Sequence, residues 1–206
     1  MRFELVGWPE DGPKLALDYR AFSYAGKFVV TNTGKAVALA DPGTDPDASP
    51  PQTEGERPPP TGVEGVVDFA DPVLGAVAFN ADRTDDAWWL RYVTVRADRH
   101  GEGIGPRLAR FTTERLRQRR AETVRIAVNN PYAYEALYRA GFAFTGDETG
   151  IAELVLAAPA DDRSRATYQA GLDLFRARGP DGDERAFLER KAGSDPPAVV
   201  ATQADD

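Results

Sequence analysis

The sequence predicts an α+β protein in which β-strands and amphipathic helices alternate along one domain. Three observations support this prediction. Two strand-like runs, residues 73–80 and 87–95, flank a polar connection suited to an antiparallel hairpin. A three-glycine turn then leads into residues 104–120, where apolar side chains recur at helical spacing. A second helix is predicted at 131–140, with a capping residue at each end.

The N-terminal third is less regular. Residues 2–8 predict a first strand, which the turn cluster at 9–13 closes, and the apolar residues between 15 and 24 predict a helix that ends near Gly26. Residues 28–30 and 36–40 flank Asn32-Thr33-Gly34 and predict a short strand pair. Residues 41–64 hold seven prolines and few apolar side chains, so they predict a mobile insertion loop.

The C-terminal half continues the pattern. Residues 123–128 are rich in β-branched side chains and predict a strand. In the following helix Asn130 is a suitable N-cap, Pro131 suits the first turn and Gly141 suits the end. Residues 142–144 and 152–156 predict the last strands of the sheet. We therefore expect a domain at 1–158, a helical extension at 159–192 with helices near 168–175 and 187–188, and a disordered tail at 193–206.

Composition excludes several classes of function. The chain carries 33 acidic and 25 basic residues, and this net charge of −8 argues against general binding to nucleic acid or acidic membranes. It has no cysteine and one histidine, which argues against disulfides, a cysteine nucleophile, a histidine triad and a metal site.

The cellular setting is predicted from two further features. No long apolar run or signal-peptide core is present, so the sequence predicts a cytoplasmic protein. The Asp-rich, Lys-poor composition suggests a halophilic source, and a GC-rich genome with an acidic protein surface is the alternative.

The turn His100-Gly101-Glu102-Gly103-Ile104-Gly105 between strand and helix predicts an anion site, because a helix start offers unpaired N–H groups and a positive dipole end. A Walker loop would need Lys and Ser or Thr after Gly105, where the chain has Pro106-Arg107. A dinucleotide fingerprint would need glycine at Pro106 and an acidic residue where Asn129-Asn130 stands. Both alternatives fail.

The segment Val95–Gly105 resembles the acetyl-CoA signature of the GNAT superfamily of N-acetyltransferases, with His100 where the family usually has Gln or Arg. Residues 130–142 resemble a second family block, in which Asn130, Ala133, Gly141 and Phe142 fall in register. The resemblance covers about residues 73–156. It implies a mixed, largely antiparallel central sheet flanked by helices and splayed between its two central strands.

The resemblance implies direct transfer of an acetyl group from acetyl-CoA to an amine, without a metal. The family's general-acid tyrosine falls at Leu137, so the nearby Tyr138 and Tyr134 are the candidate catalytic residues. Asp86, Glu64 and Glu153 are possible general bases, and none is assigned. Arg107 and Arg110 are candidates for phosphate contacts. The residues implied to bind the coenzyme are Val93, Thr94, Val95, His100, Gly101, Glu102, Gly103, Ile104, Gly105, Pro106 and Asn130.

Two other functions stay open at this stage. The displaced tyrosine and His100 would suit a catalytically weak, acyl-CoA-binding regulatory protein of the same fold. Alternatively, the Pro-rich insertion or the C-terminal helices would dock a partner or a second copy of the chain, as in a homodimer. The acceptor amine is not predicted.

Overall fold

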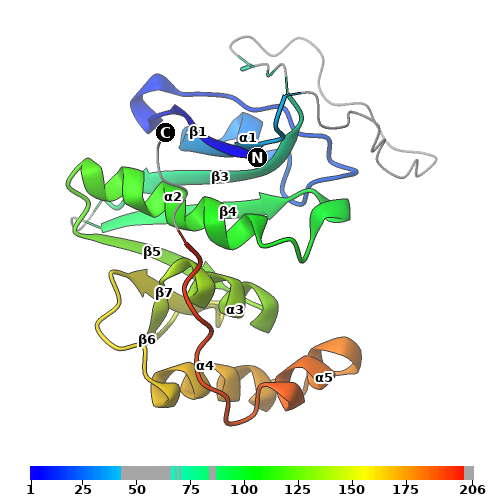
Figure 1. Cartoon of the computed structure of the whole chain (residues 1–206). Coiled ribbons are helices and arrows are strands. Elements are labelled where there is room, and N and C mark those ends of the chain that lie inside the picture. Colours follow the sequence, from blue (N-terminus) through cyan, green and yellow to red (C-terminus); the bar gives the residue numbers. More distant parts are fainter. Residues whose placement is uncertain (43–65, 68, 70, 84–86, 202–206) are drawn as a thin grey trace.

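The computed structural model describes residues 1–42, 66, 67, 69, 71–83 and 87–201. Its centre is a seven-stranded sheet in the order β1-β2-β3-β4-β5-β7-β6 (Figure 1). Neighbouring strands are antiparallel except β4 and β5, which are parallel. The predicted mixed, largely antiparallel sheet is therefore confirmed. The strands are β1 (Arg2–Gly7), β2 (Gly34–Leu39), β3 (Val73–Ala81), β4 (Ala87–Val95), β5 (Thr123–Val128), β6 (Ala143–Glu148) and β7 (Leu154–Ala158).

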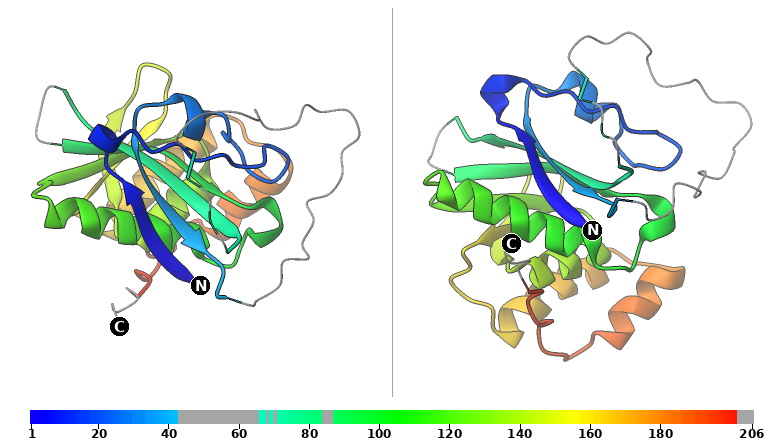
Figure 2. Two further views of the ribbon diagram at one scale, coloured as in Figure 1. Left: turned by 90° about the horizontal axis from the view of Figure 1, so that it is seen from above. Right: turned by 45° about the horizontal axis from the view of Figure 1, so that its top comes forward.

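Helices cover the sheet on both faces (Figure 2). The side chains of α2 and α3 belong to a core cluster on one face, and α1 packs with the preceding loop in a second cluster on the other face. Strand β2 alternates between the two clusters, with Ala36 and Ala38 in the first and Val37 and Leu39 in the second. The helices are α1 (Lys27–Val30), α2 (Ile104–Gln118), α3 (Pro131–Ala140), α4 (Arg165–Ala177) and α5 (Gly182–Arg190), with 3₁₀ turns η1 (Pro9–Asp11) and η2 (Ala97–Arg99).

Helix α3 has the caps that its sequence predicts. The Asn130 side chain accepts a hydrogen bond from Ala133 N at 2.8 Å, which satisfies one of the free amides of the first turn. Pro131 occupies the first turn, and Gly141 ends the helix with a φ of 102°. These local signals place the beginning and end of α3 where the chain must leave and rejoin the sheet.

Two predictions for the N-terminal region were wrong. Residues 28–30 lie in the short helix α1, and the helix expected at 15–24 is a series of turns and irregular chain. The edge of β2 that was expected to pair with residues 28–30 is taken by β1, and its other edge pairs with β3. Leu15 and Phe28 are nevertheless fully buried, because this irregular chain covers the second cluster.

The C-terminal helices pack on the side of the sheet that carries β6 (Figure 1). Tyr168, Leu172 and Phe175 form the buried face of α4, as their spacing predicted. Beyond α5, the chain that was expected to be disordered continues to residue 201 as an irregular segment, in which Val200 N donates to Arg139 O at 2.8 Å. Residues 202–206 and the insertion from residue 43 to 64 lie outside the described residues. The division into domain, extension and tail stays a prediction.

None of the helices within the described residues has both the length and the apolar character that crossing a membrane requires.

Candidate active site

Strands β4 and β5 diverge in the middle of the sheet. Their pairing covers only Ala87–Trp89 against Thr123–Arg125. Further along β4, the register with β3 shifts between Leu90 and Tyr92, so Arg91 is the extra residue of a β-bulge. A bulge bends its strand and increases its twist. The divergence leaves the C-terminal parts of both strands without a shared ladder and opens a gap between them.

A cavity of about 920 Å³ occupies this gap. Its walls combine side chains from both faces of the sheet: Val93 and Ile104 belong with the α2 face, whereas Tyr92 packs with the second cluster. The cavity therefore passes between the two strands rather than lying on one face. The cavity is also lined by Tyr24, Arg91, Val95, His100, Gly101, Gly103, Gly105, Pro106, Asn130, Tyr132, Glu135, Ala136, Leu137, Arg139, Glu153 and Phe187.

The glycine turn forms one end of the cavity. Gly101 and Gly103 have φ angles of 87° and 73°, a left-handed conformation that residues with a Cβ adopt only with strain. Helix α2 begins after Gly103 without a side-chain cap. The amides of Ile104 and Gly105 belong to its first turn and have no helical acceptor, whereas Pro106 has no N–H. The turn thus presents free donors and the positive end of the α2 dipole to the cavity.

Arginine and imidazole side chains hold this turn, and the arginines add positive charge. His100 Nε2 lies 3.0 Å from Val95 O and ties the turn to the end of β4. Arg107 Nε donates to Gly103 O at 3.0 Å. A guanidinium nitrogen of Arg139 lies 3.7 Å from the position that a Cβ on Gly103 would take. This arrangement is suited to a phosphate or diphosphate group.

The main chain of β4 faces the cavity at alternate residues. Arg96 N donates to Leu74 O at 2.9 Å, in the direction of β3. Because N–H and C=O groups of alternate residues point the same way in an antiparallel strand, Thr94 also points toward β3. The main-chain groups of Val93 and the N–H of Val95 point instead to the side from which β5 has diverged, whereas Val95 O is already hydrogen-bonded to His100. The groups on that side can bind an extended ligand that runs along β4.

The structure does not bring the two predicted catalytic tyrosines to the cavity. Tyr134 and Tyr138 are fully buried and belong to the core. Tyr134 Oη donates to Tyr168 O at 3.1 Å, and Tyr138 Oη accepts from Phe144 N at 3.1 Å. Burial raises the pKa of both hydroxyls. Neither tyrosine is placed to give a proton to a group in the cavity.

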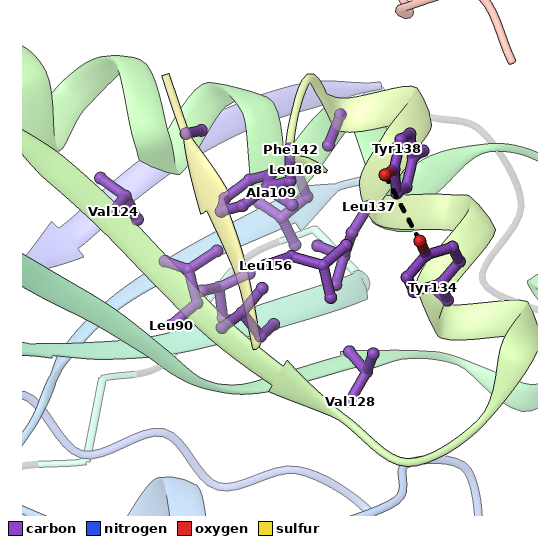
Figure 3. Packing of buried hydrophobic residues seen from close by; sticks show 14 of the residues in the cluster. Leu90, Leu108, Ala109, Val124, Val128, Tyr134, Leu137, Tyr138, Phe142 and Leu156 are labelled. Carbon is purple, nitrogen blue, oxygen red and sulfur yellow. Dashed lines mark hydrogen bonds between the residues drawn. The ribbon is translucent and has the colours of Figure 1, made fainter. Parts of the chain in front are cut away.

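Leu137 lines the cavity in their place. In Figure 3 the hydroxyls of Tyr134 and Tyr138 are turned toward each other, and Leu137 is directed away from them, on the side of Leu156. One helical step rotates a side chain by about 100°, so a tyrosine one residue later cannot replace the family's tyrosine at Leu137. Leu137 holds the family's tyrosine position by its spacing, and the structure places Tyr138 in the core instead of the cavity.

Of the residues predicted to bind the coenzyme, Thr94 and Glu102 do not line the cavity. Thr94 is 5% exposed and directs its main chain to β3. Their assignment, like that of the other members, stays a prediction about binding. The predicted residues that do line the cavity are Val93, Val95, His100, Gly101, Gly103, Ile104, Gly105, Pro106 and Asn130.

Glu153 alone of the three possible general bases lines the cavity in the described residues, since Asp86 and Glu64 lie outside them. It follows Ala152, whose φ of 61° is unusual for a residue with a side chain. Arg178, at the end of α4, donates to Ala152 O at 2.6 Å. The C-terminal extension therefore supports the turn that carries Glu153.

Several lining residues were not predicted. Tyr92 adjoins Val93 on β4, and Tyr132 lies two residues after Asn130, so position next to the family motifs could have indicated them. Tyr24 and Phe187 come from the N-terminal loop and from α5, far from either motif, and no local signal marks them. The rings of Tyr24 and Tyr92 have centroids 5.7 Å apart, and both side chains line the cavity.

No set of three His, Asp or Glu side chains in the described part of the chain is grouped to hold a metal ion. The glycine turn and the strand amides of the cavity suit a phosphate-bearing ligand.

Comparison with solved structures finds proteins of low similarity. Nourseothricin acetyltransferase matches with 19% identity and a TM-score of 0.41, over 61% of this chain and 64% of that one. The PaiA N-acetyltransferase from Thermoplasma acidophilum in complex with coenzyme A has 14% identity and a TM-score of 0.36, over 41% and 52%. Ribosomal-protein-alanine N-acetyltransferase from Brucella melitensis has 18% identity and a TM-score of 0.40, over 61% and 67%. This chain thus spans less than two thirds of the first two proteins.

A search of curated proteins finds no match. The family model of the GNAT acetyltransferases, in contrast, matches residues 34–142, which is more than half of the 206 residues. The matched region includes the diverging strands, the glycine turn and α3 with its caps. This chain belongs to the acetyltransferase (GNAT) family.

Proposed function

We propose that the protein transfers an acetyl group from acetyl-CoA directly to an amine. The glycine turn carries this proposal, because its free amides open onto a cavity between two diverging strands. The turn, with Arg139 beside it, suits the diphosphate of the coenzyme. The pantetheine arm then runs along β4, where Val93 and the N–H of Val95 present main-chain groups, and the thioester lies between the strands.

In the proposed reaction the neutral amine attacks the thioester carbonyl. A C–N bond forms, the C–S bond breaks, and the thiolate of coenzyme A leaves. The main-chain N–H of Val93 faces the cavity and is our candidate for stabilising the negative charge on the carbonyl oxygen. Leu137 supplies no proton, so water protonates the thiolate. An alkyl thiol such as that of cysteine has a pKa of about 8.5, so a thiolate of this kind can leave before it is protonated.

Glu153 is the proposed acceptor of the amine's proton, directly or through water. It lines the cavity together with Tyr24 and Tyr92, whose paired rings form an aromatic wall. A carboxylate and aromatic rings that line the same cavity suit an amine that arrives as a cation. This combination is consistent with an acceptor that carries a primary ammonium group, and its identity is left to the assay.

The first test is calorimetric titration with acetyl-CoA at low and at molar salt, beside Gly103→Trp. We expect micromolar binding that the variant loses, and a requirement for molar salt would support a halophilic source. Release of free thiol with a panel of amines then tests turnover. Binding without turnover would favour the acyl-CoA-binding regulatory protein, and absence of binding at either salt would contradict the proposed function.

A further inference from the structure

An aromatic pair lies in the wall of the cavity, where α3 meets the C-terminal extension. The rings of Tyr132 and Phe187 have centroids 4.8 Å apart and an interplanar angle of 51°. Tyr132, in the first turn of α3, is 46% exposed, and Phe187 of α5 is half-buried against the core. Both line the cavity. Exposed aromatic rings in the wall of the same cavity as the glycine turn can stack on a flat, apolar part of a ligand.

Hydrogen bonds and ion pairs hold α5 against α3 and α4. Lys191 Nζ lies 2.7 Å from a carboxylate oxygen of Glu135, and Tyr168 Oη donates to the other oxygen at 3.1 Å. Arg176 donates to Leu188 O at 3.0 Å, and Leu188 is buried. These contacts join three helices at a point next to Phe187. Phe187 is therefore held in place by the fold.

The aromatic pair lies about two helical turns along α3 from the glycine turn. Tyr132, Ala136 and Arg139 line the cavity at i, i+4 and i+7, which places them on one face of α3. Arg139 reaches Gly103, so the face leads from the turn to the aromatic pair over two helical turns, about 10 Å. The small side chain of Ala136 leaves room between them. Figures 1 and 2 place α5 and the start of α2 at the same edge of the molecule.

Coenzyme A has both groups that this surface could bind, a flat adenine ring and phosphates. With its diphosphate at the glycine turn and its pantetheine arm between the strands, its adenosine 3′-phosphate must lie outside, over the exposed face of α3. We propose that Tyr132 and Phe187 form a stacking surface for the adenine ring, with Arg139 as a cation for the adjoining phosphates. This inference rests on the proposed function and adds a second binding region to it.

The proposal assigns a role to a part of the chain that the family match does not include, since the match ends at residue 142. Pairing of a base with aromatic rings is a recurrent way to bind nucleotides without reading the base. The extension would then be part of the coenzyme site. A partner protein that covered the same aromatic pair would instead leave coenzyme binding unchanged when the pair is altered.

The test uses fragments of the coenzyme. Calorimetry would compare the binding of coenzyme A, adenosine 3′,5′-bisphosphate and 4′-phosphopantetheine to the wild type and to Tyr132→Ala, Phe187→Ala and Phe187→Leu. We expect about tenfold weaker binding of the first two ligands to each variant, because each loses a ring that stacks on the base. Binding of 4′-phosphopantetheine, which has no adenine, should not change.

Phe3→Ala is the matched control, because Phe3 stacks on Phe111 at 5.6 Å in another aromatic pair that does not line the cavity. Equal affinity of wild type and variants for coenzyme A would overturn the inference and leave the proposed function intact. A wild type that does not bind coenzyme A would overturn both. If the Phe187 variants do not fold, the largely exposed Tyr132 decides the question, with thermal unfolding as the check on folding.

Discussion

Leu137 and Tyr138 are neighbours on α3 and face different surroundings. Leu137 lines the cavity between β4 and β5, whereas Tyr138 is fully buried and its hydroxyl accepts a hydrogen bond from Phe144 N at 3.1 Å. The side chain at the family's acid position, a leucine, therefore has no acidic proton to donate, and the adjacent tyrosine belongs to the core. The tyrosine hydroxyls are therefore separated from the cavity in which we propose that the coenzyme binds.

Replacing Tyr138 with Phe should leave acetyl transfer and its pH profile unchanged within about twofold. The free energy of unfolding should fall by about 1–3 kcal/mol, because the buried N–H of Phe144 would lose its acceptor. Steady-state kinetics and urea unfolding measure the two effects. A folded Tyr138→Phe variant that has lost turnover would show that this hydroxyl reaches the reaction after all.

Replacing Gly103 with Ala should weaken coenzyme A binding at least about tenfold, the equivalent of about 1.4 kcal/mol. The added methyl group would stand in the turn and force strain at a φ of 73°. Gly179→Ala is the matched control, because Gly179 has a φ of 70°, open space around it and no place in the cavity. Both variants should lose about 1–2 kcal/mol of stability, and only Gly103→Ala should lose affinity.

Replacing Glu153 with Gln should lower kcat/KM for the amine about a hundredfold near neutral pH and leave coenzyme affinity unchanged. The loss should shrink as the pH approaches the amine's own pKa, about 10.4 for an alkyl amine, because the neutral amine needs no base. Glu148→Gln removes a carboxylate from the same β6–β7 hairpin, one that pairs with Arg178 and does not line the cavity. Similar kinetics for the two variants would argue against Glu153 as the base.

Lys35 should make stability depend on pH in the alkaline range. Its side chain on β2 is fully buried, and its ammonium donates to Thr31 O, Thr33 O and Thr33 Oγ1 at 3.2, 2.9 and 3.1 Å. Burial lowers the pKa of this ammonium to about 8. The unfolded chain, with a lysine pKa of about 10.4, binds more protons between these values, so the free energy of unfolding should rise with pH there.

Lys35→Met lacks this titration and provides the reference. The difference in free energy of unfolding between wild type and variant should increase from pH 8 to pH 10, by at most about 1.4 kcal/mol per pH unit. Urea unfolding at pH 7, 8, 9 and 10 measures it. A difference that decreases over this range would mean that the three oxygen acceptors favour the ammonium more than burial opposes it.

Features that depend on neighbouring residues could be predicted from the amino-acid sequence. The glycine turn, the start of α2 and the caps of α3 follow from the few residues that form them, because caps and turns are short-range contacts. The two strand-like runs at 73–80 and 87–95 and the polar connection between them predicted the β3–β4 hairpin for the same reason. The assignment of Leu137 to the family's tyrosine position rests on its spacing from Asn130, which is a property of the chain alone.

Contacts between segments that are distant in the sequence could not be predicted in the same way. Residues 28–30 have strand-like side chains, yet β1 and β3 occupy both edges of β2, so they form α1. The sequence makes Tyr138 a candidate catalytic residue, whereas in the structure its hydroxyl accepts from Phe144 N and its ring packs on Tyr168 of α4. Phe187 reaches Tyr132 from 55 positions away because Lys191 and Glu135 hold α5 in place. Such contacts depend on the packing of whole elements, so the neighbouring residues in the sequence do not predict them.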